Sequence, residues 1–483
     1  MNKEQIGKNT IYSVIKQIST IIFPLITFPY ISRVLLVDNV GKINFGESVI
    51  SYVSLIASLG ISTYAVRECS KVKESKKELS DIASQILSIN LITTIIAYIV
   101  LGILLLFVDK FEDYRLLIGI QSITIIFTTL GADWLNTAME DLKFIAVRTV
   151  IFQVVALSLM FIFVHKPEHY YIYALITVVS GGGANIVNMV YRRRYCNVSI
   201  TTKIEYKKHI VPILLMFSMI LSQTIYCNSD ITIVGLIHGD HEVGIYSVAV
   251  KIYNIVNALV ASISFVVMPK LSYWFEKKNY DEINKLVKYA LNFIVFLGLP
   301  CLVGINTITS ELIQIIAGNQ YLDAVIPLRI LSVALLFSFL GGFCGNIIFL
   351  PSGREAICLR AGVTSAIVNL VLNIILVPKY GIIAAAATTA FSELISFLIC
   401  KKYIEREIKI KGISKMIKSP VFGCCGIIAV GLLGNALISG IITRAIVILV
   451  LSIVVYIGIL LAFKDEFLLN MVNPAINKFM TKR

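Results

Sequence analysis

Long apolar runs alternate with short polar segments along the whole chain. About fourteen of these runs reach the roughly 20 residues that cross a bilayer as a helix. They cover residues 11–35, 45–64, 82–108, 116–135, 144–164, 171–191, 210–237, 243–268, 286–307, 324–350, 356–377, 382–399, 417–437 and 441–463. The runs are continuous rather than alternating, which favours helices over the strands of a membrane barrel. The pattern therefore predicts an all-α polytopic membrane protein with about fourteen transmembrane helices.

The composition agrees with this class and excludes several others. Hydrophobic residues make up 57% of the 483 residues and charged residues 15%, whereas a soluble domain carries roughly 25% charged residues. This charge is too sparse for the surface of a soluble enzyme, and the hydrophobicity excludes a disordered chain. The nine cysteines lie mostly inside apolar runs without metal-ligand spacing. We expect them to be structural thiols rather than a disulfide framework.

The basic residues are distributed unevenly between the two sides of the predicted membrane. A net charge of +14 would suggest nucleic acid for a soluble protein, but in a membrane protein the placement of charge matters more. With a cytoplasmic N-terminus and alternating sides, 33 of the 43 Lys and Arg residues fall in cytoplasmic segments and eight fall outside. Lys16 and Lys251 fall within apolar runs. This asymmetry predicts an even number of spans, both termini in the cytoplasm, and no nucleic-acid partner.

Two basic connections, near residues 192–208 and 401–418, divide the spans into groups of six, six and two. We therefore predict an N-lobe at 1–204, a C-lobe at 205–411, and two further helices with a cytoplasmic tail at 412–483. The first and seventh hairpins share a short pattern, Val40-Gly41 and Val243-Gly244, each opening into an apolar span. Repeated halves of this kind are typical of transporters.

Charged residues within spans are expensive, roughly 2.5–3.5 kcal/mol each at a helix centre, so they mark candidate functional positions. Lys16 lies near the start of its span, where it either snorkels to the surface or faces a cavity. Lys251 lies deeper, and we expect it to face a cavity or to pair with Glu47 or Asp230. Glu393 is a further acidic candidate within a late span.

Two other acidic positions have both a functional and a structural interpretation. Asp230 lies in an unusually polar stretch, residues 222–230, which suits a cation or proton relay as well as hydrogen-bonded packing. Asp133 and Glu140 are seven residues apart, so on one helix they would share a face. Trp134 beside them favours an interfacial anchor. Pro24 and Pro29 predict a bent first helix.

The motifs that are absent argue against an enzyme. The sequence contains no G-x-x-x-x-G-K-[ST] phosphate loop, no H-E-x-x-H motif and no large outer loop that could carry a catalytic cluster. We expect no catalytic residues, no metal site and no bound cofactor.

Several segments resemble one family, the Wzx-type polysaccharide flippases. The resemblance rests on the proline-rich opening at 24–35, on Leu59-Gly60-Ile61 with Arg67-Glu68, and on Asp133-Trp134 with Glu140-Asp141. A late segment, 369–381, with its two asparagines and Pro378, is also similar. The similarity extends over roughly the first twelve spans, and the family belongs to the multidrug/oligosaccharidyl-lipid/polysaccharide exporter superfamily.

The resemblance implies a function as well as a fold. Family members move undecaprenyl-diphosphate-linked oligosaccharide across the bacterial inner membrane by alternating access, through a cationic cavity formed by two six-helix lobes. It then implies that Lys16, Arg33, Lys251 and Arg67 bind the anionic head group. Glu47, Asp230, Asp133 and Glu393 are expected to serve ion coupling or gating, with H⁺ or Na⁺ as the coupling ion. Membrane lipids and a polysaccharide polymerase machinery are the expected partners.

Two rival functions stay open at the level of sequence. A cation-coupled drug or small-molecule antiporter of the same superfamily would depend on Asp230 or Glu47 rather than on cations. A membrane glycosyltransferase or polymerase would need a catalytic outer loop. The sequence identifies neither the sugar nor whether the product is O-antigen or capsule.

Overall fold

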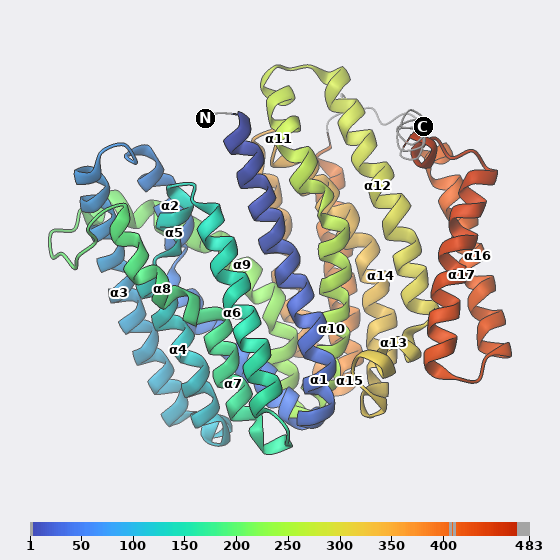
Figure 1. Cartoon of the computed structure of the whole chain (residues 1–483), viewed down its shortest axis with the longest axis horizontal. Helices are drawn as coiled ribbons and strands as arrows, with labels where there is room; N and C mark the ends of the chain where they lie inside the picture. Colours follow the sequence, from blue (N-terminus) through green and yellow to red (C-terminus); the bar gives the residue numbers. More distant parts are fainter. Residues whose placement is uncertain (1–2, 405–407, 409–411, 471–483) are drawn as a thin grey trace. The chain divides into compact units, whose positions relative to one another are not determined.

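The computed structural model describes residues 3–404, 408 and 412–470 (Figure 1). All regular structure in this part of the chain is helical, which confirms the predicted all-α class. Twelve described segments are long and apolar enough to cross a membrane by length and composition. The expected number of fourteen is not confirmed.

Two long helices contain a residue that is not helical. The helix α1 (Lys3–Ser58) leaves helical geometry at Leu36, with φ 66° and ψ 175°, and α15 (Glu355–Lys402) does so at Gly381, with φ 56° and ψ −140°. An unbroken helix of 56 residues would be about 84 Å long, nearly three times the ~30 Å hydrocarbon core. Each break lies between two runs that the sequence predicts as separate spans. Each long helix is therefore a pair of helical segments.

The chain separates into two compact units, Met1–Gly244 and Ile245–Arg483. The lobes predicted at 1–204, 205–411 and 412–483 stay a prediction, and part of the predicted tail, residues 471–483, lies outside the described residues. The first unit contains α1, α2 (Ile61–Lys71), α3 (Lys76–Phe107), α4 (Arg115–Gly131), α5 (Asp133–Ala138), α6 (Leu142–Phe163), α7 (Tyr170–Val178), α8 (Ala184–Tyr191) and α9 (Tyr206–Ile237). The α10 helix (Asp240–Ala261) begins at the end of this unit.

Within the first unit, α1 packs against α3, α4, α6 and α9. A cluster of buried apolar side chains joins α2, the start of α3, α5 and the start of α9, and Trp134 is part of it. The chain reaches α8 through a π-helical turn at Val179–Gly183 and leaves it through a 3-10 turn at Arg192–Arg194. The Gly181-Gly182-Gly183 run thus lies at a local widening of the helix, where small residues permit close packing.

The glycines of the two similar hairpins, Gly41 and Gly244, lie where the two hairpins cross: Gly41 contacts the backbone at Asp240, and Gly244 contacts the backbone at Val37. A Cβ added to Gly41 would lie 1.8 Å from the carbonyl oxygen of Asp240, and one added to Gly244 would lie 2.3 Å from that of Val37. Tyr114 donates a hydrogen bond to Asp240 beside this crossing. Only glycine allows such an approach of two backbones.

The close approach of the two backbones at Gly41 predicts a loss of stability when a side chain is added there. We expect Gly41→Ala to destabilise the folded protein by about 1–3 kcal/mol, the usual cost of overpacking, because its new methyl group meets backbone rather than a movable side chain. The measurement is the thermal unfolding midpoint of the purified protein in detergent. Gly102→Ala in α3 is the control, since nothing lies within 4 Å of an added Cβ there. Equal thermal midpoints for the two variants would contradict the claim that the backbone crossing requires glycine at position 41.

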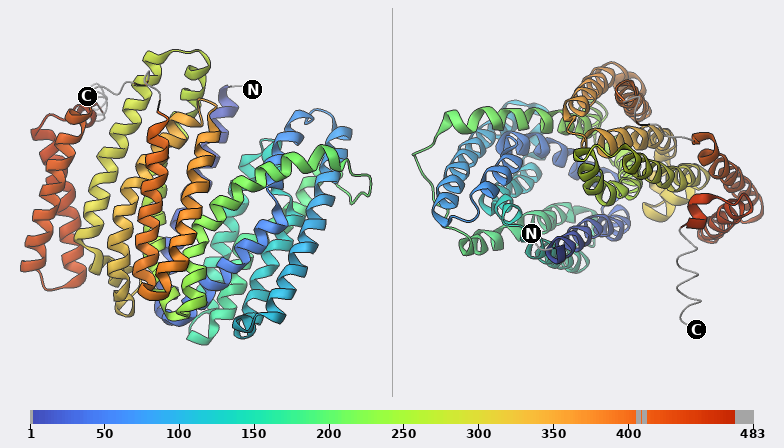
Figure 2. Two further views of the ribbon diagram at one scale, coloured as in Figure 1. Left: turned by 180° about the vertical axis from the view of Figure 1, so that it is seen from behind. Right: turned by 90° about the horizontal axis from the view of Figure 1, so that it is seen from above.

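The second unit contains most of α10 and the helices α11 (Ile263–Glu276), α12 (Tyr280–Thr307), α13 (Thr309–Ile316), α14 (Val325–Gly342), α15, α16 (Ile413–Leu437) and α17 (Ile441–Ala462). The α14 and α15 helices pack along each other, and the α16–α17 hairpin packs on α12 (red in Figure 2). Arg444 of α17 pairs with the buried Glu311 of α13 at 2.5 Å, and Tyr456 donates to the carbonyl of Phe296 at 2.8 Å. These polar contacts fix the hairpin to the rest of the unit.

Candidate functional site

Three of the expected site residues lie on α1, and all three are exposed. They are Lys16, Arg33 and Glu47. Lys16 and Arg33 are 17 residues apart, which corresponds to about 26 Å of helix, so the two cations lie at very different depths. The guanidinium of Arg33 donates to the carbonyl of Pro29 at 2.5 Å. Lys16 and Arg33 therefore do not form one compact cation cluster.

Arg67 lies on α2 in a local charge cluster. Its guanidinium donates to Glu68 at 3.0 Å, and Lys71 donates to the same carboxylate at 2.8 Å. Arg67 also lies 5.6 Å from the ring centre of Tyr64, whose hydroxyl contacts His209 at 2.7 Å. Two cations share one carboxylate here, so this end of α2 keeps a net positive charge.

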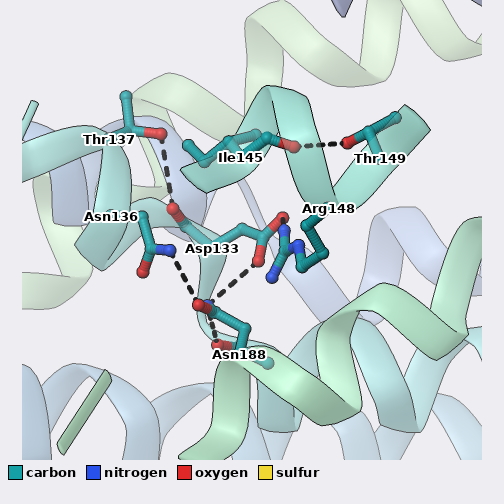
Figure 3. Close-up of polar contacts among 8 residues, drawn as sticks. Asp133, Asn136, Thr137, Ile145, Arg148, Thr149 and Asn188 are labelled. Carbon is teal, nitrogen blue, oxygen red and sulfur yellow. Dashed lines mark hydrogen bonds and ion pairs between the residues drawn. The ribbon is translucent and has the colours of Figure 1, made fainter. Parts of the chain in front are cut away.

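Asp133 is the centre of the best-defined polar network in the first unit (Figure 3). Arg148 of α6, which is only 4% exposed, pairs with the Asp133 carboxylate at 2.6 Å. The amide of Asn188 donates to Asp133 at 3.1 Å and to the carbonyl of Gly131 at 2.6 Å, and accepts a bond from Asn136 at 2.7 Å. The network joins α5, α6 and α8 across the break between α4 and α5.

The structure corrects the expected relation between Asp133 and Glu140. The α5 helix ends at Ala138, and Glu140 has a left-handed backbone with φ 60°. The two carboxylates therefore do not share a helix face, and Glu140 instead pairs with Lys73 at 2.7 Å. Trp134 is 5% exposed within the apolar cluster of the first unit, which argues against an interfacial anchor.

Asp230 is buried on α9 among polar neighbours. Thr232, two residues further along α9, donates to Ser48 of α1 at 2.9 Å. Asn228, two residues before Asp230, donates to the carbonyl of Thr224 at 3.0 Å. Asp230 itself is 7% exposed. The polar stretch seen in the sequence is thus packed against α1, which fits both of the roles expected for it.

In the second unit, the structure places Lys251 and Glu393 on neighbouring helices. Tyr253 of α10, two residues after Lys251, donates to the carboxylate of Glu393 in α15 at 3.0 Å. Both Lys251 and Glu393 are half-buried. The expected pairing of Lys251 with Glu47 or Asp230 would join residues of different units and stays a prediction.

Glu393 lines a cavity of about 210 Å³ with a mixed polar and apolar wall within the second unit. Asn257 on its wall donates to Ser338 at 3.2 Å, and Ser264, Asn346 and Ser396 also line it. Asn346 belongs to the π-helical turn Phe343–Phe349, a geometry that often accompanies functional positions. A cavity of this size holds several waters at roughly 30 Å³ each, so Glu393 has a route to hydration.

A buried amide network crosses the break in α15. Asn373 donates to Asn369 at 3.1 Å and accepts from Thr388 at 2.6 Å, and all three side chains are buried. The two asparagines come from the first segment and the threonine from the second. In sequence the two asparagines contribute to the family resemblance, and their positions four residues apart in an apolar run are the signal that they share a buried face.

Metal and disulfide chemistry find no support in the part of the chain that the structure describes. No group of three or more His, Cys, Asp or Glu side chains there could hold a metal ion. All nine cysteines are free thiols, and five of them are buried.

The fold and these charges define the class of protein. A chain with twelve described apolar segments of membrane-spanning length is a multi-pass membrane protein. A family model described as "Polysaccharide biosynthesis protein" matches residues 6–275, more than half of the chain. The chain belongs to this family, which confirms the resemblance noted in the sequence.

Individual relatives and one solved structure extend the comparison. The chain is 24% identical over 390 residues to a "Putative O-antigen transporter" of Shigella dysenteriae, covering 80% of this chain and 96% of the relative. It is 24% identical over 402 residues to the "Capsular polysaccharide biosynthesis protein CapF" of Staphylococcus aureus, covering 81% and 97%. In fold it is similar to "Lipid II flippase MurJ, inward closed conformation", with a TM-score of 0.76, 17% identity and coverage of 96% and 99%.

Proposed function

We propose that this protein is a flippase for undecaprenyl-diphosphate-linked oligosaccharide in the bacterial inner membrane, and that it is a transporter rather than an enzyme. The observation that carries the proposal is the family match over residues 6–275, together with relatives matched over nearly their whole length whose names include an O-antigen transporter. The membrane lipids around the polyprenyl tail are its other partners, and a polysaccharide polymerase machinery receives the product.

We assign head-group binding to Lys16, Arg33, Lys251 and Arg67. A diphosphate carries about two negative charges, and each must keep a partner when it leaves water. The exposure of Lys16, Arg33 and Arg67 and the partial exposure of Lys251 leave these cations accessible to a large anionic ligand. Lys251 is the strongest candidate because it lies within a membrane-spanning helix that also contacts the Glu393 region through Tyr253.

Reconstitution of the purified protein in liposomes tests the proposal. A fluorescent undecaprenyl-diphosphate oligosaccharide is placed in both leaflets, and a lectin outside reports how much becomes accessible. We expect the accessible fraction to rise above one half only in vesicles that contain the protein, with the recovered lipid unchanged in mass. Protein-dependent lengthening of the sugar chain would instead favour a polymerase, and no protein-dependent change would overturn the proposal.

The drug-antiporter alternative makes a different prediction in cells. Such a protein would lower susceptibility to cationic drugs through Asp230 or Glu47, whereas the proposed flippase leaves susceptibility unchanged.

We further propose that the acidic residues Glu47, Asp230, Asp133 and Glu393 serve coupling or gating, with H⁺ or Na⁺ as the driving ion. Glu393 is the most direct candidate, because it lines a cavity with several polar side chains and its carboxylate accepts a bond from Tyr253. We expect Glu393→Gln to lose most of the stimulation of transport by an imposed pH or Na⁺ gradient while binding of the lipid-linked sugar is kept. Glu355→Gln at the exposed start of α15 is the control. Full gradient stimulation in Glu393→Gln would contradict this role.

The orientation with both termini in the cytoplasm is also a proposal. It rests on the basic connections, of which residues 405–407 and 409–411 lie outside the described part. In a cysteine-free background, cysteines at Lys401 and Lys415 should react with a membrane-impermeant thiol reagent only after the cells are opened. A cysteine at Lys166, in a predicted outer loop, is the matched position and should react in intact cells. Labelling in the reverse pattern would invert the topology.

A further inference from the structure

A surface pocket in the first unit contains none of the residues assigned above. It has a volume of about 430 Å³ and is lined by Asp141, Lys143, Phe144, Val147, Tyr191 and Arg194. These residues come from the start of α6, the end of α8 and the 3-10 turn that follows α8. The pocket therefore lies where two predicted spans emerge from the membrane.

The aromatic wall of this pocket is held in place by a single carboxylate. The rings of Phe144 and Tyr191 stack with their centres 3.5 Å apart and 7° between their planes. Tyr191 and Tyr195 donate to Asp141 at 2.8 and 2.6 Å, and Asp141 also caps α6 by accepting from the backbone of Phe144 at 3.2 Å. Burial opposes ionisation of Asp141, but the hydrogen bonds from the two tyrosines and the cap lower the pKa of its carboxyl. Asp141 is therefore ionised at neutral pH, and both of its carboxylate oxygens accept hydrogen bonds.

The lining of the pocket contains two cations and one carboxylate, so its net charge is positive. Lys143 and Arg194 are both exposed, and among the described residues neither forms an ion pair; Arg194 donates only to the Tyr191 hydroxyl, at 3.3 Å. Lys143 is the second residue of α6, where a cation is unfavourable because the N-terminus is the positive end of the helix dipole. Asp141 attracts Arg194, but one carboxylate cannot balance two cations and the positive end of a helix, and it already accepts three hydrogen bonds. A bound anion would offset the repulsion among the two cations and the positive end of α6.

The apolar side of the pocket indicates which kind of anion. Val147 lines the pocket, and the exposed Ile151 and Val154 continue the same face of α6 toward the membrane interior. A phosphate at the cations would leave an attached acyl chain against this face. We propose that this pocket binds the phosphate group of an anionic phospholipid.

Lipid binding to purified protein tests the site. The probes are phosphatidylglycerol, phosphatidylcholine and inorganic phosphate, and the readouts are lipid adducts in native mass spectrometry and the thermal unfolding midpoint. Wild type should bind phosphatidylglycerol in preference to phosphatidylcholine. The double variant Lys143→Gln, Arg194→Gln should bind phosphatidylglycerol about 30-fold more weakly, since each basic residue near an anionic lipid contributes roughly one factor of five.

The control is Arg193→Gln with Lys203→Gln, which removes two exposed cations that do not line the pocket. It should keep wild-type binding, and both variants should elute as wild type does in size exclusion. Equal losses in the two double variants would show that general surface charge attracts the lipid, and would overturn the site. An equal midpoint shift with inorganic phosphate would overturn the lipid assignment. Neither outcome depends on the proposed flippase activity, because no transport is measured.

Discussion

Replacement of Lys251 by alanine should strongly reduce the delivery of polysaccharide to the cell surface while the protein still inserts into the membrane. Lys251 lies within a membrane-spanning helix and is half-buried. A hydrogen bond to a charged group contributes about 1.5–3 kcal/mol, so loss of one head-group cation should slow transport about 10- to 100-fold. The measurements are surface polysaccharide in a complemented flippase-deficient strain and the rate in liposomes.

Two controls separate this role from a structural one. Lys251→Arg keeps the charge and should keep most of the activity. Lys270→Ala removes an exposed lysine from the adjoining helix α11 and should leave transport unchanged. Normal surface polysaccharide in Lys251→Ala, at equal protein abundance, would remove Lys251 from the head-group site.

Asp133→Asn should lower the stability of the fold more than any other acidic substitution in the first unit that we consider. Removing one member of a buried ion pair costs about 3–5 kcal/mol, but the Asp133 side chain is 41% exposed and water screens part of the interaction. We therefore expect about 2–3 kcal/mol, seen as a lower thermal midpoint of the purified protein. The loss arises because Arg148, 4% exposed, keeps its charge without a counter-ion.

A double variant gives this prediction its sharpest test. Asp133→Asn with Arg148→Met removes both charges, and it should recover part of the lost stability because no unpaired buried charge remains. Asp81→Asn, at an exposed position of α3, should change the midpoint little. Additive losses in the double variant would show that the two charges are energetically independent, and that the network of Figure 3 depends on the asparagines instead.

The sequence located breaks between spans better than it located polar partners. The first two apolar runs and the eleventh and twelfth were separated where α1 and α15 leave helical geometry, at Leu36 and Gly381. The relation between Asp133 and Glu140 failed because a seven-residue spacing implies a shared face only on a continuous helix. The helix ends at Ala138, and no residue spacing reports that end.

The candidate site shows the same limit. Lys251, Asp230 and Glu393 stood out because a charge in an apolar run is costly wherever the helix lies. The hydrogen-bond partners of the acidic candidates, such as Tyr253 for Glu393 and Asn188 for Asp133, are ordinary residues in sequence, and only the structure identifies them. Val40-Gly41 and Val243-Gly244 were a weak repeat until the two glycines proved to lie at a backbone crossing.

The sequence by itself determined the membrane class, the approximate position of the spans and the family, because hydrophobicity and motif identity belong to each segment alone. The tertiary structure decided which charges are paired, where polar cavities lie and why Gly41 must be glycine. Those properties depend on which helices pack together, and that choice is made by side chains far apart in the chain.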